Sequence, residues 1–441
     1  MGTLDPGALR VCIVAENASF RFGGEASLPL HYYSRLRARG LEAWLIVHGR
    51  TREELEELFP NDSGRIQFIP DKWFHKLIWR LNTFLPRRVA QATMGTLMVL
   101  VNQCIQRQMV QALIASHQVN IVHQPIPVSP RAPSFICKLG VPVVIGPLNG
   151  GMDYPKAFRH VESWITRGSV ALGRSCANLV NRAIPGKKLA SFVLVANQRT
   201  RLALPSCIEG QVVEIPENGV DLGLWSAQPQ TTTGEDPPRF LFMGRLVDWK
   251  RLDWAIQALA NVPGAYLDVI GDGPMRAEWT RLAASLNIDD RTRFRGWLPQ
   301  HECARLLQSA TALLLPSIYE CGGAVVLEAM AAGIPVIAVA WGGPEDYLDE
   351  TCGMLIPPLD AATVVDGFTT GMKKLIDHPQ LRSNLGAAAR RRVQATFCWE
   401  EKVDRMIEIY RLAVDRAAAK GISGKLSKLQ TQAQSPQWEP R

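Results

Sequence analysis

Short β-rich segments alternate with helical periodicity along most of this 441-residue chain. In such an order each helix connects two strands, which predicts parallel sheets covered by helices on both faces. The strands expected in the first half are Arg10–Glu16, Leu41–His48, Ile66–Pro70, Asn120–Gln124, Pro142–Gly146, Phe192–Asn197 and Val212–Pro216. Those expected in the second half are Phe240–Leu246, Ala265–Gly271, Arg293–Leu298, Ala312–Pro316 and Pro335–Ala340.

The alternation is interrupted once, at the polar, Pro-rich residues 227–238, which we interpret as a linker. The predicted fold class is therefore α/β, with two tandem, doubly wound, Rossmann-like domains over residues 1–226 and 239–398. Ligands bind outside the carboxyl ends of the strands in such sheets, so we expect the two domains to face a central cleft. We expect residues 399–417 to form an amphipathic helix that returns to the N-terminal domain, and residues 418–441 to be disordered.

The composition argues against several classes of protein. No run of 18 or more apolar residues is present, and Met1–Arg10 lacks the apolar core of a secretory signal. The nine cysteines are scattered without a Cys-x-x-Cys pair, which is typical of a reducing, cytoplasmic location. No Asp-x-Asp motif or cluster of metal-ligand side chains occurs, so we predict no metal.

The strongest candidates for binding residues lie between the strand that ends near residue 316 and the next helix. Glu320 precedes Gly322 and Gly323, and a helix is expected from about Ala324. Glycines allow close backbone approach, and the start of a helix offers free N–H groups to a phosphate. Glu328 lies one turn into this helix among apolar neighbours, where a carboxylate needs a partner because burying it alone is costly. Two adjacent ribose hydroxyls would satisfy it, as would a core lysine or a backbone amide, and the side chain could also simply lie at the edge of the helix.

Glu320 and Glu328 are separated by seven residues, and further stretches follow in a recognisable order. Together they resemble the retaining glycosyltransferases of family 4, which have the GT-B fold, over nearly the whole chain and best from about Val193 to Pro358. The other stretches that carry the resemblance are PENGVD (Pro216–Asp221), FMGRLVDWKRLD (Phe242–Asp253), VIGDGP (Val269–Pro274), FRGWL (Phe294–Leu298) and GMLIPP (Gly353–Pro358).

The resemblance implies transfer of a sugar from a nucleotide-diphosphate sugar to a glycan or lipid-linked acceptor, in cell-surface polysaccharide or glycolipid synthesis. It implies no cofactor, because the nucleotide sugar is a substrate. Arg245 and Lys250 match the basic pair that holds the donor diphosphate and neutralises charge as the sugar departs. Glu328 matches the ribose-binding carboxylate, and Glu320 matches the carboxylate near the donor sugar's hydroxyls.

In the first domain the resemblance places Gly23 and Gly24 in a glycine loop over the diphosphate and His123 near the donor sugar. Asn149 and Asp153 follow a predicted strand and are candidates for acceptor-side contacts. Glycine pairs are also common in turns, and an isolated histidine is often only structural. No side chain stands out as a nucleophile, so we favour same-face substitution in which the departing phosphate takes the acceptor's proton.

A basic segment gives the first domain an uneven charge. No Asp or Glu occurs from residue 72 to residue 152, and Lys72–Leu85 has helical spacing with Lys72, Lys76 and Arg80 on one face and apolar side chains on the other. Such a helix can lie on an anionic membrane surface or pack its apolar face on its own domain. We favour a cytoplasmic enzyme that binds peripherally to the inner face of the cell membrane. No nucleic-acid-binding motif accompanies the charge, so we expect no nucleic-acid partner.

Two other functions are compatible with these residues. A nucleotide-sugar epimerase of the same fold would act without an acceptor, and a non-catalytic subunit would bind the sugar nucleotide without turnover. A dinucleotide dehydrogenase is disfavoured because neither domain opens with Gly-x-Gly-x-x-Gly.

Overall fold

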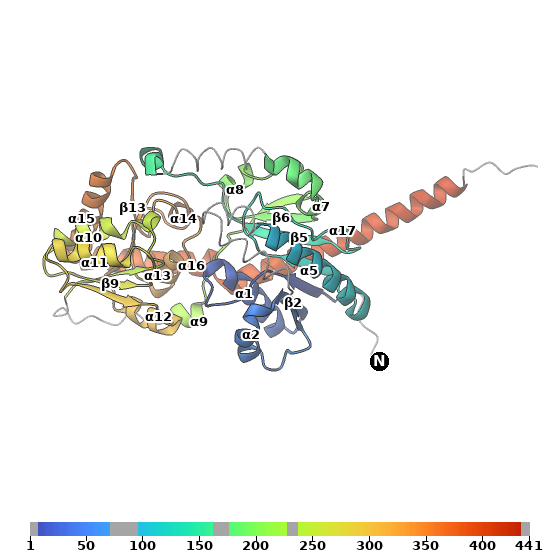
Figure 1. Cartoon of the computed structure of the whole chain (residues 1–441), viewed down its shortest axis with the longest axis horizontal. Helices are drawn as coiled ribbons and strands as arrows, with labels where there is room; N and C mark the ends of the chain where they lie inside the picture. The colour runs from blue at the N-terminus through green and yellow to red at the C-terminus, as the bar shows by residue number, and fades with distance from the viewer. Residues whose placement is uncertain (1–7, 71–95, 162–175, 227–236, 434–441) are drawn as a thin grey trace, which may run out of the picture. The chain divides into compact units, whose positions relative to one another are not determined.

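The computed structural model describes residues 8–70, 96–161, 176–226 and 237–433 (Figure 1). The chain divides into two compact units. Unit 1 contains Met1–Leu148, Gly173–Ile215 and Val403–Arg441, and unit 2 contains Asn149–Leu172 and Pro216–Lys402. The boundaries therefore differ from the predicted ranges 1–226 and 239–398, because the chain passes between the units more than once. Local composition does not reveal on which unit a loop packs.

Unit 1 is built on a seven-stranded sheet in which all neighbouring strands are parallel. The strand order is β3-β2-β1-β4-β5-β6-β7, so the direction of winding reverses between β1 and β4. This is the doubly wound arrangement expected from the sequence. The strands are β1 (Arg10–Val14), β2 (Glu42–His48), β3 (Ile66–Ile69), β4 (Ile121–Gln124), β5 (Val143–Leu148), β6 (Phe192–Val195) and β7 (Gln211–Glu214).

Helices cover this sheet through their apolar side chains. Helix α5 (Thr96–His117) packs Val110 and Leu113 into a core with Cys12 of β1 and Ile145 of β5. Further helices of unit 1 are α1 (Gly24–Ala38), η1 (Gly49–Thr51), α2 (Arg52–Leu58), α7 (Gly186–Leu189) and α8 (Gln198–Leu202).

Unit 2 contains a six-stranded parallel sheet with the order β10-β9-β8-β11-β12-β13. Its winding reverses between β8 and β11, which lie side by side in the middle of the sheet. The strands are β8 (Arg239–Met243), β9 (Tyr266–Ile270), β10 (Thr292–Gly296), β11 (Ala312–Leu315), β12 (Val336–Val339) and β13 (Met354–Ile356). Strand β13 is an addition to the strands predicted from the sequence, because three residues at a sheet edge are too few to show a clear periodicity.

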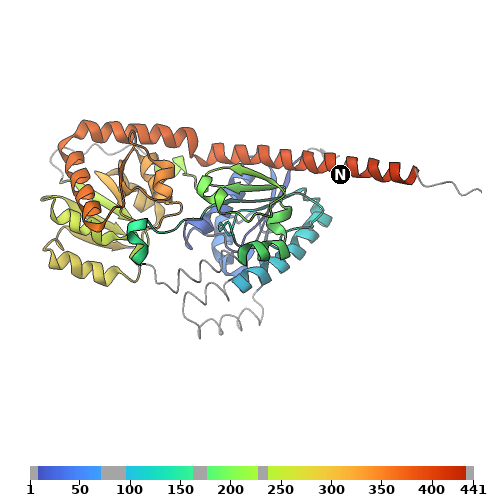
Figure 2. The same cartoon turned by 90° about the horizontal axis from the view of Figure 1, so that it is seen from above.

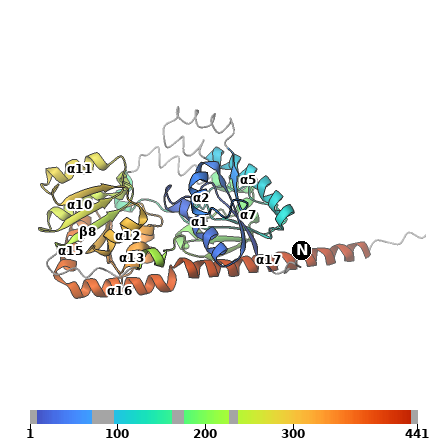
Figure 3. The same cartoon turned by 90° about the horizontal axis from the view of Figure 1, so that it is seen from below.

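The sheet of unit 2 has an apolar core on each face. One core holds side chains of α10, α11 and α15, and the other holds side chains of α12, α13 and α16, as Figure 3 shows for α10 and α11 against α12 and α13. The helices are η3 (Lys156–Val161), α9 (Leu222–Trp225), η4 (Asp248–Lys250), α10 (Leu252–Ala260), α11 (Arg276–Ser285), α12 (Gln300–Gln308), α13 (Ala324–Ala332), α14 (Gly343–Tyr347), α15 (Ala361–Asp377) and α16 (Pro379–Thr396).

The last helix, α17, runs from Trp399 to Ala433 and is drawn in red in Figure 2. From Val403 onward it is part of unit 1. The helix continues to Ala433, where the sequence predicted disorder from residue 418. A polar composition alone does not stop a helix that has already been nucleated, because adding a residue to an existing helix is far easier than starting one.

Candidate functional site

The predicted donor-binding side chains follow the two central strands of unit 2. Arg245 and Lys250 come after β8, and Glu320 comes after β11. Because these strands flank the point where the winding reverses, the loops after them leave the same edge of the sheet and diverge. A backbone hydrogen bond of 3.0 Å from Ile318 N to Trp249 O joins the two loops.

Within this edge, the ammonium of Lys250 forms an ion pair with the carboxylate of Glu320. Both side chains are largely buried, with 14% and 13% of their surface exposed. The guanidinium of Arg245 is exposed and makes no hydrogen bond or ion pair with the residues that the structure describes. Two positive groups therefore lie after β8, one already paired and one available to an anionic ligand.

The loop after β11 ends at the start of α13, as the sequence predicted. Gly323 has a left-handed backbone with φ 75°, and no side chain caps the helix there. Gly322 is buried, and a Cβ atom on it would lie 2.3 Å from Asn218 Nδ2. The loop thus leaves the first N–H groups of a nine-residue helix without a side-chain acceptor, which favours an anion at this end.

Glu328 projects from α13 and is partly buried. Among the described residues none donates a hydrogen bond to its carboxylate or forms an ion pair with it. Burial raises the pKa of Glu328 to about 7. Burial is also the main cause of the raised pKa of Cys303 on α12, and the charge of Glu328 adds to it. The core lysine or backbone amide that the sequence left open as a partner is not found in the described part of the chain, and the partial exposure of the side chain agrees with the other alternative, a place at the edge of the helix. The carboxylate is therefore available to an external donor.

Asn149 and Asp153 lie in the segment that joins unit 2 directly after β5. The amide of Asn149 is 4% exposed and donates to Glu217 Oε2 at 2.6 Å and to the Cys321 carbonyl at 3.0 Å. The side chain of Asp153 is exposed, and its carbonyl accepts from Trp341 Nε1 at 2.8 Å. The buried Asn149 side chain is thus hydrogen-bonded to the loop that carries Glu320, whereas the Asp153 side chain is exposed.

In unit 1, Gly23 and Gly24 follow β1 and begin α1. Both glycines are exposed, and a Cβ atom on either would meet nothing within 4 Å. The φ of Gly23 is 102°, a conformation that L side chains rarely adopt, and no side chain caps the helix. This geometry suits a glycine loop that approaches a phosphate, and the role itself remains a prediction.

His123 lies in β4 and is completely buried. Its Nε2 is 2.6 Å from the Gly146 carbonyl, and because a carbonyl only accepts, Nε2 carries the proton. Nδ1 then accepts from the hydroxyl of Tyr410 on α17 at 2.7 Å, and burial keeps the pKa of Tyr410 well above its ordinary value. The imidazole links three elements of unit 1, so contact with a donor sugar would require it to be uncovered.

The sequence did not single out four polar residues of unit 2, which are Glu217, Asn218, Tyr347 and Lys402, although the first two lie in the stretch PENGVD. Glu217 and Lys402 are 6% and 7% exposed, and Asn218 donates to the Tyr347 hydroxyl at 3.1 Å. The signal for Glu217 and Asn218 was a Glu-Asn pair shortly after β7, a position that often carries polar contacts at a sheet edge.

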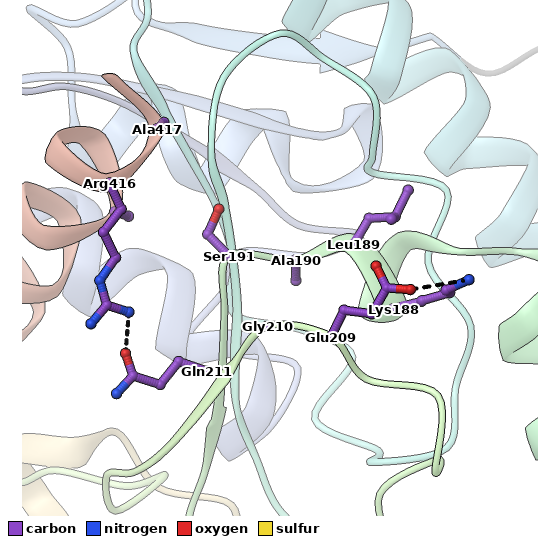
Figure 4. A pocket seen from close by; sticks show the side chains of 10 residues that line it. Lys188, Leu189, Ala190, Ser191, Glu209, Gly210, Gln211, Arg416 and Ala417 are labelled. Carbon is purple, nitrogen blue, oxygen red and sulfur yellow. Dashed lines mark hydrogen bonds and ion pairs between the residues drawn. The ribbon is translucent and has the colours of Figure 1, made fainter. Parts of the chain in front are cut away.

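Other features lie apart from these residues. Figure 4 shows a pocket of unit 1 lined by Lys188–Ser191, Glu209–Gln211 and Arg416 of α17, and none of the predicted site residues borders it. In the described part of the chain no group of His, Cys, Asp and Glu side chains could hold a metal ion. No helix among the described residues is long and apolar enough to cross a bilayer. The predicted membrane-binding residues Lys72, Lys76 and Arg80 fall outside the described ranges.

Unit 2 is similar in sequence to known proteins. Residues 225–392, most of unit 2, match the family model for glycosyl transferases group 1. Glycogen synthase from Mycobacterium tuberculosis is 31% identical over 259 residues, which cover 57% of this chain and 56% of that protein. The chain thus spans about half the length of the curated relatives it matches.

Solved structures extend the similarity to the whole fold. Sucrose-phosphate synthase from Thermosynechococcus elongatus superimposes with a TM-score of 0.64 at 22% identity, covering 91% of this chain and 98% of that one. HepE from Anabaena, solved in complex with UDP, gives a TM-score of 0.64 at 16% identity over 91% of this chain and 99% of its own. The fold is therefore GT-B.

Proposed function

We propose that this chain is a retaining glycosyltransferase of family 4. It transfers a sugar from a nucleotide-diphosphate sugar to a glycan or lipid-linked acceptor, in the synthesis of a cell-surface polysaccharide or glycolipid. Relatives named as glycogen synthase and as a lipopolysaccharide core glycosyltransferase, and the UDP-glucose complex of HepE, support a sugar nucleotide as donor.

The observation that carries the proposal is the carboxylate of Glu328, which has no hydrogen-bond or ion-pair partner among the residues that the structure describes. It lies one turn into a helix that begins at a glycine, and the loop before that helix pairs with Lys250. A ribose has two adjacent hydroxyl donors that match two carboxylate oxygens, and the attached diphosphate matches the basic side chains and the helix start. A nucleoside diphosphate satisfies all of these groups at once.

In the proposed reaction, the bond between the sugar C1 and the diphosphate oxygen breaks, and its electron pair remains on the diphosphate. The acceptor hydroxyl oxygen forms a new bond to C1 on the same face, and its proton moves to the departing phosphate oxygen. Arg245 and Lys250 stabilise the charge that develops on the leaving group. An ammonium has three donors, so Lys250 can bind the diphosphate and Glu320 together. The basic side chains and the helix start supply this stabilisation without a metal.

A donor screen on the full chain tests the proposal. UDP-, GDP- and ADP-sugars are incubated with the protein and a membrane lipid extract, and labelled product and free nucleoside diphosphate are measured. We expect equal amounts of the two from one donor, with the anomeric configuration retained in the product. Transfer that is unchanged in both Glu328→Ala and Lys250→Ala would overturn the site. Conversion of the donor without an acceptor would favour the epimerase, and nucleotide binding without turnover would favour the non-catalytic subunit.

The proposed membrane contact is tested separately. Changing Lys72, Lys76 and Arg80 to Glu is expected to abolish binding to liposomes that contain anionic lipid. Liposome binding at the level of the unchanged chain would contradict a peripheral membrane enzyme bound through this segment.

A further inference from the structure

The chain passes between the two units at three points in the described residues. These points follow Leu148, Ile215 and Lys402. A buried polar residue of unit 2 lies at each of these points. It is either the residue of unit 2 next to the crossing or the one after that. These residues are Asn149, Glu217 and Lys402, with exposures of 4%, 6% and 7%.

The three side chains belong to one hydrogen-bonded cluster inside unit 2. Asn149 Nδ2 donates to Glu217 Oε2 at 2.6 Å, and the ammonium of Lys402 donates to the Glu217 carbonyl. The same ammonium lies 4.3 Å from the centre of the Trp399 ring. These hydrogen bonds join residues that are far apart in the sequence, because Lys402 and Glu217 are separated by 185 positions.

The cluster supports the loop that carries the predicted donor-binding groups. Asn149 Nδ2 also donates to the Cys321 carbonyl at 3.0 Å. A Cβ atom on the next residue, Gly322, would lie 2.3 Å from Asn218 Nδ2 and 3.0 Å from Glu217 Oε2. A second residue, Gly343, donates its N–H to the Glu320 carbonyl at 2.7 Å. The carbonyls of two successive loop residues, Glu320 and Cys321, are thus each held by a hydrogen bond from another segment.

A buried polar cluster is not an efficient way to stabilise a fold, because desolvating its groups offsets much of what their hydrogen bonds contribute. What such a cluster does supply is a defined position for the backbone it bonds. We propose that Asn149 is a positioning residue that, together with Glu217, holds the backbone of Cys321–Gly323 in the conformation that binds the donor diphosphate. This inference rests on the proposed function and replaces the acceptor-side contact expected for Asn149 from the sequence.

The test compares full-length variants by two measurements. Hydrogen exchange of peptides covering Ser317–Val325 reports the order of the loop without any ligand, and equilibrium binding of UDP, GDP and ADP reports the diphosphate site. We expect Asn149→Ala to raise loop exchange about fivefold or more and to weaken nucleoside diphosphate binding about tenfold. The matched control is Asn181→Ala in unit 1, whose buried amide likewise donates to two carbonyls, those of Arg131 and Ala177 at 2.9 Å. The control should change neither measurement.

Two further variants separate positioning from filling of space. Asn149→Asp keeps the size of the side chain but places a carboxylate against Glu217 Oε2 and the Cys321 carbonyl, so it should impair binding at least as much as Asn149→Ala. A residue that only fills space would tolerate aspartate better than alanine. Should the Asn149 variants not fold, Glu217→Met is expected to reproduce the loss from the other side of the bond, and Glu217→Gln, which still accepts from Asn149, to retain binding within about threefold.

The outcomes distinguish the two proposals. Loop exchange and nucleoside diphosphate binding at the level of the unchanged chain in Asn149→Ala or Glu217→Met would overturn the positioning role. If the unchanged chain itself binds none of the three nucleoside diphosphates, the proposed function and the role built on it both fall. In that case the exchange data still report whether Asn149 orders the loop.

Discussion

The ammonium of Lys250 and the carboxylate of Glu320 form an ion pair although the two residues follow different strands. Lys250 ends the short helix after β8, and Glu320 lies in the loop after β11. The strands are neighbours at the reversal point of the sheet, which brings together loops 70 residues apart in the chain. The pair therefore places one positive and one negative group side by side where the sheet is expected to bind its ligand.

We predict that Lys250→Ala lowers the rate of sugar transfer about 10²- to 10³-fold, because it removes a cation that is proposed to stabilise the departing diphosphate. The measurement is kcat and KM with the donor that the screen identifies. Lys188→Ala serves as control, since Lys188 forms an ion pair with Glu209 at 3.2 Å in unit 1, apart from the proposed site. An equal loss in both variants would indicate a general effect on the protein instead of a role in transfer.

We predict that Glu328→Ala removes the preference for a ribose with both hydroxyls. The unchanged chain should bind the nucleoside diphosphate at least about tenfold more tightly than its 2′,3′-dideoxy analogue, since hydrogen bonds to a charged group are worth about 1.5–3 kcal/mol each. Calorimetric titration of both ligands against both proteins gives the comparison. Glu278→Ala on α11 is the control. A preference that survives in Glu328→Ala would place the ribose elsewhere.

Glu328 also predicts a pH dependence of stability. Its pKa is raised from 4.5 to about 7 in the folded chain, so between these values the folded state binds more protons than the unfolded state. Stability contributed by the protonated group is present below about pH 4.5 and is lost as the pH rises through 7. Relative to the unchanged chain, Glu328→Gln should gain about 1–3 kcal/mol of unfolding free energy between pH 4.5 and 8, the partial exposure being taken into account. Urea unfolding at several pH values measures it, and a difference independent of pH would contradict the burial of an unpaired carboxylate.

Gly322 is predicted to tolerate no side chain. A methyl group there would lie 2.3 Å from Asn218 Nδ2, so Gly322→Ala should displace the loop, lower the unfolding free energy by about 1–3 kcal/mol and weaken donor binding. Gly264→Ala is the matched control, because Gly264 has φ 74° and nothing within 4 Å of an added Cβ. It should cost about 1 kcal/mol of backbone strain and leave binding unchanged. Identical binding losses in the two variants would argue against close packing of the loop.

Transfer is predicted to be insensitive to EDTA. In the proposed site, Arg245, Lys250 and the start of α13 supply the positive charge that the diphosphate needs. Initial rates with EDTA and with added magnesium should agree within about twofold. A loss of activity in EDTA that magnesium restores would show that a metal takes part.

The order of strands and helices could be predicted because each depends on local periodicity. All strands expected from the sequence are present. Their alternation with helices predicts parallel, doubly wound sheets. The glycines before α13 and the carboxylate at Glu328 were likewise visible, since helix starts and a charged residue among apolar ones are features of adjacent residues. Chain order alone also put Lys250 and Glu320 after two strands of one sheet.

Tertiary structure alone decided which groups are paired and which are available. His123 is enclosed by Tyr410, 287 residues further along the chain, and Asn149 is bonded to Cys321, 172 residues away. Burial and hydrogen bonding depend on which distant residues fill the space around a side chain, and sequence spacing carries no such information. The sequence therefore determined the elements and the kinds of chemical groups at their ends. Packing determined that Glu328 lacks a described partner and that Asn149 bonds Glu217 and Cys321, because only the folded chain sets their neighbours.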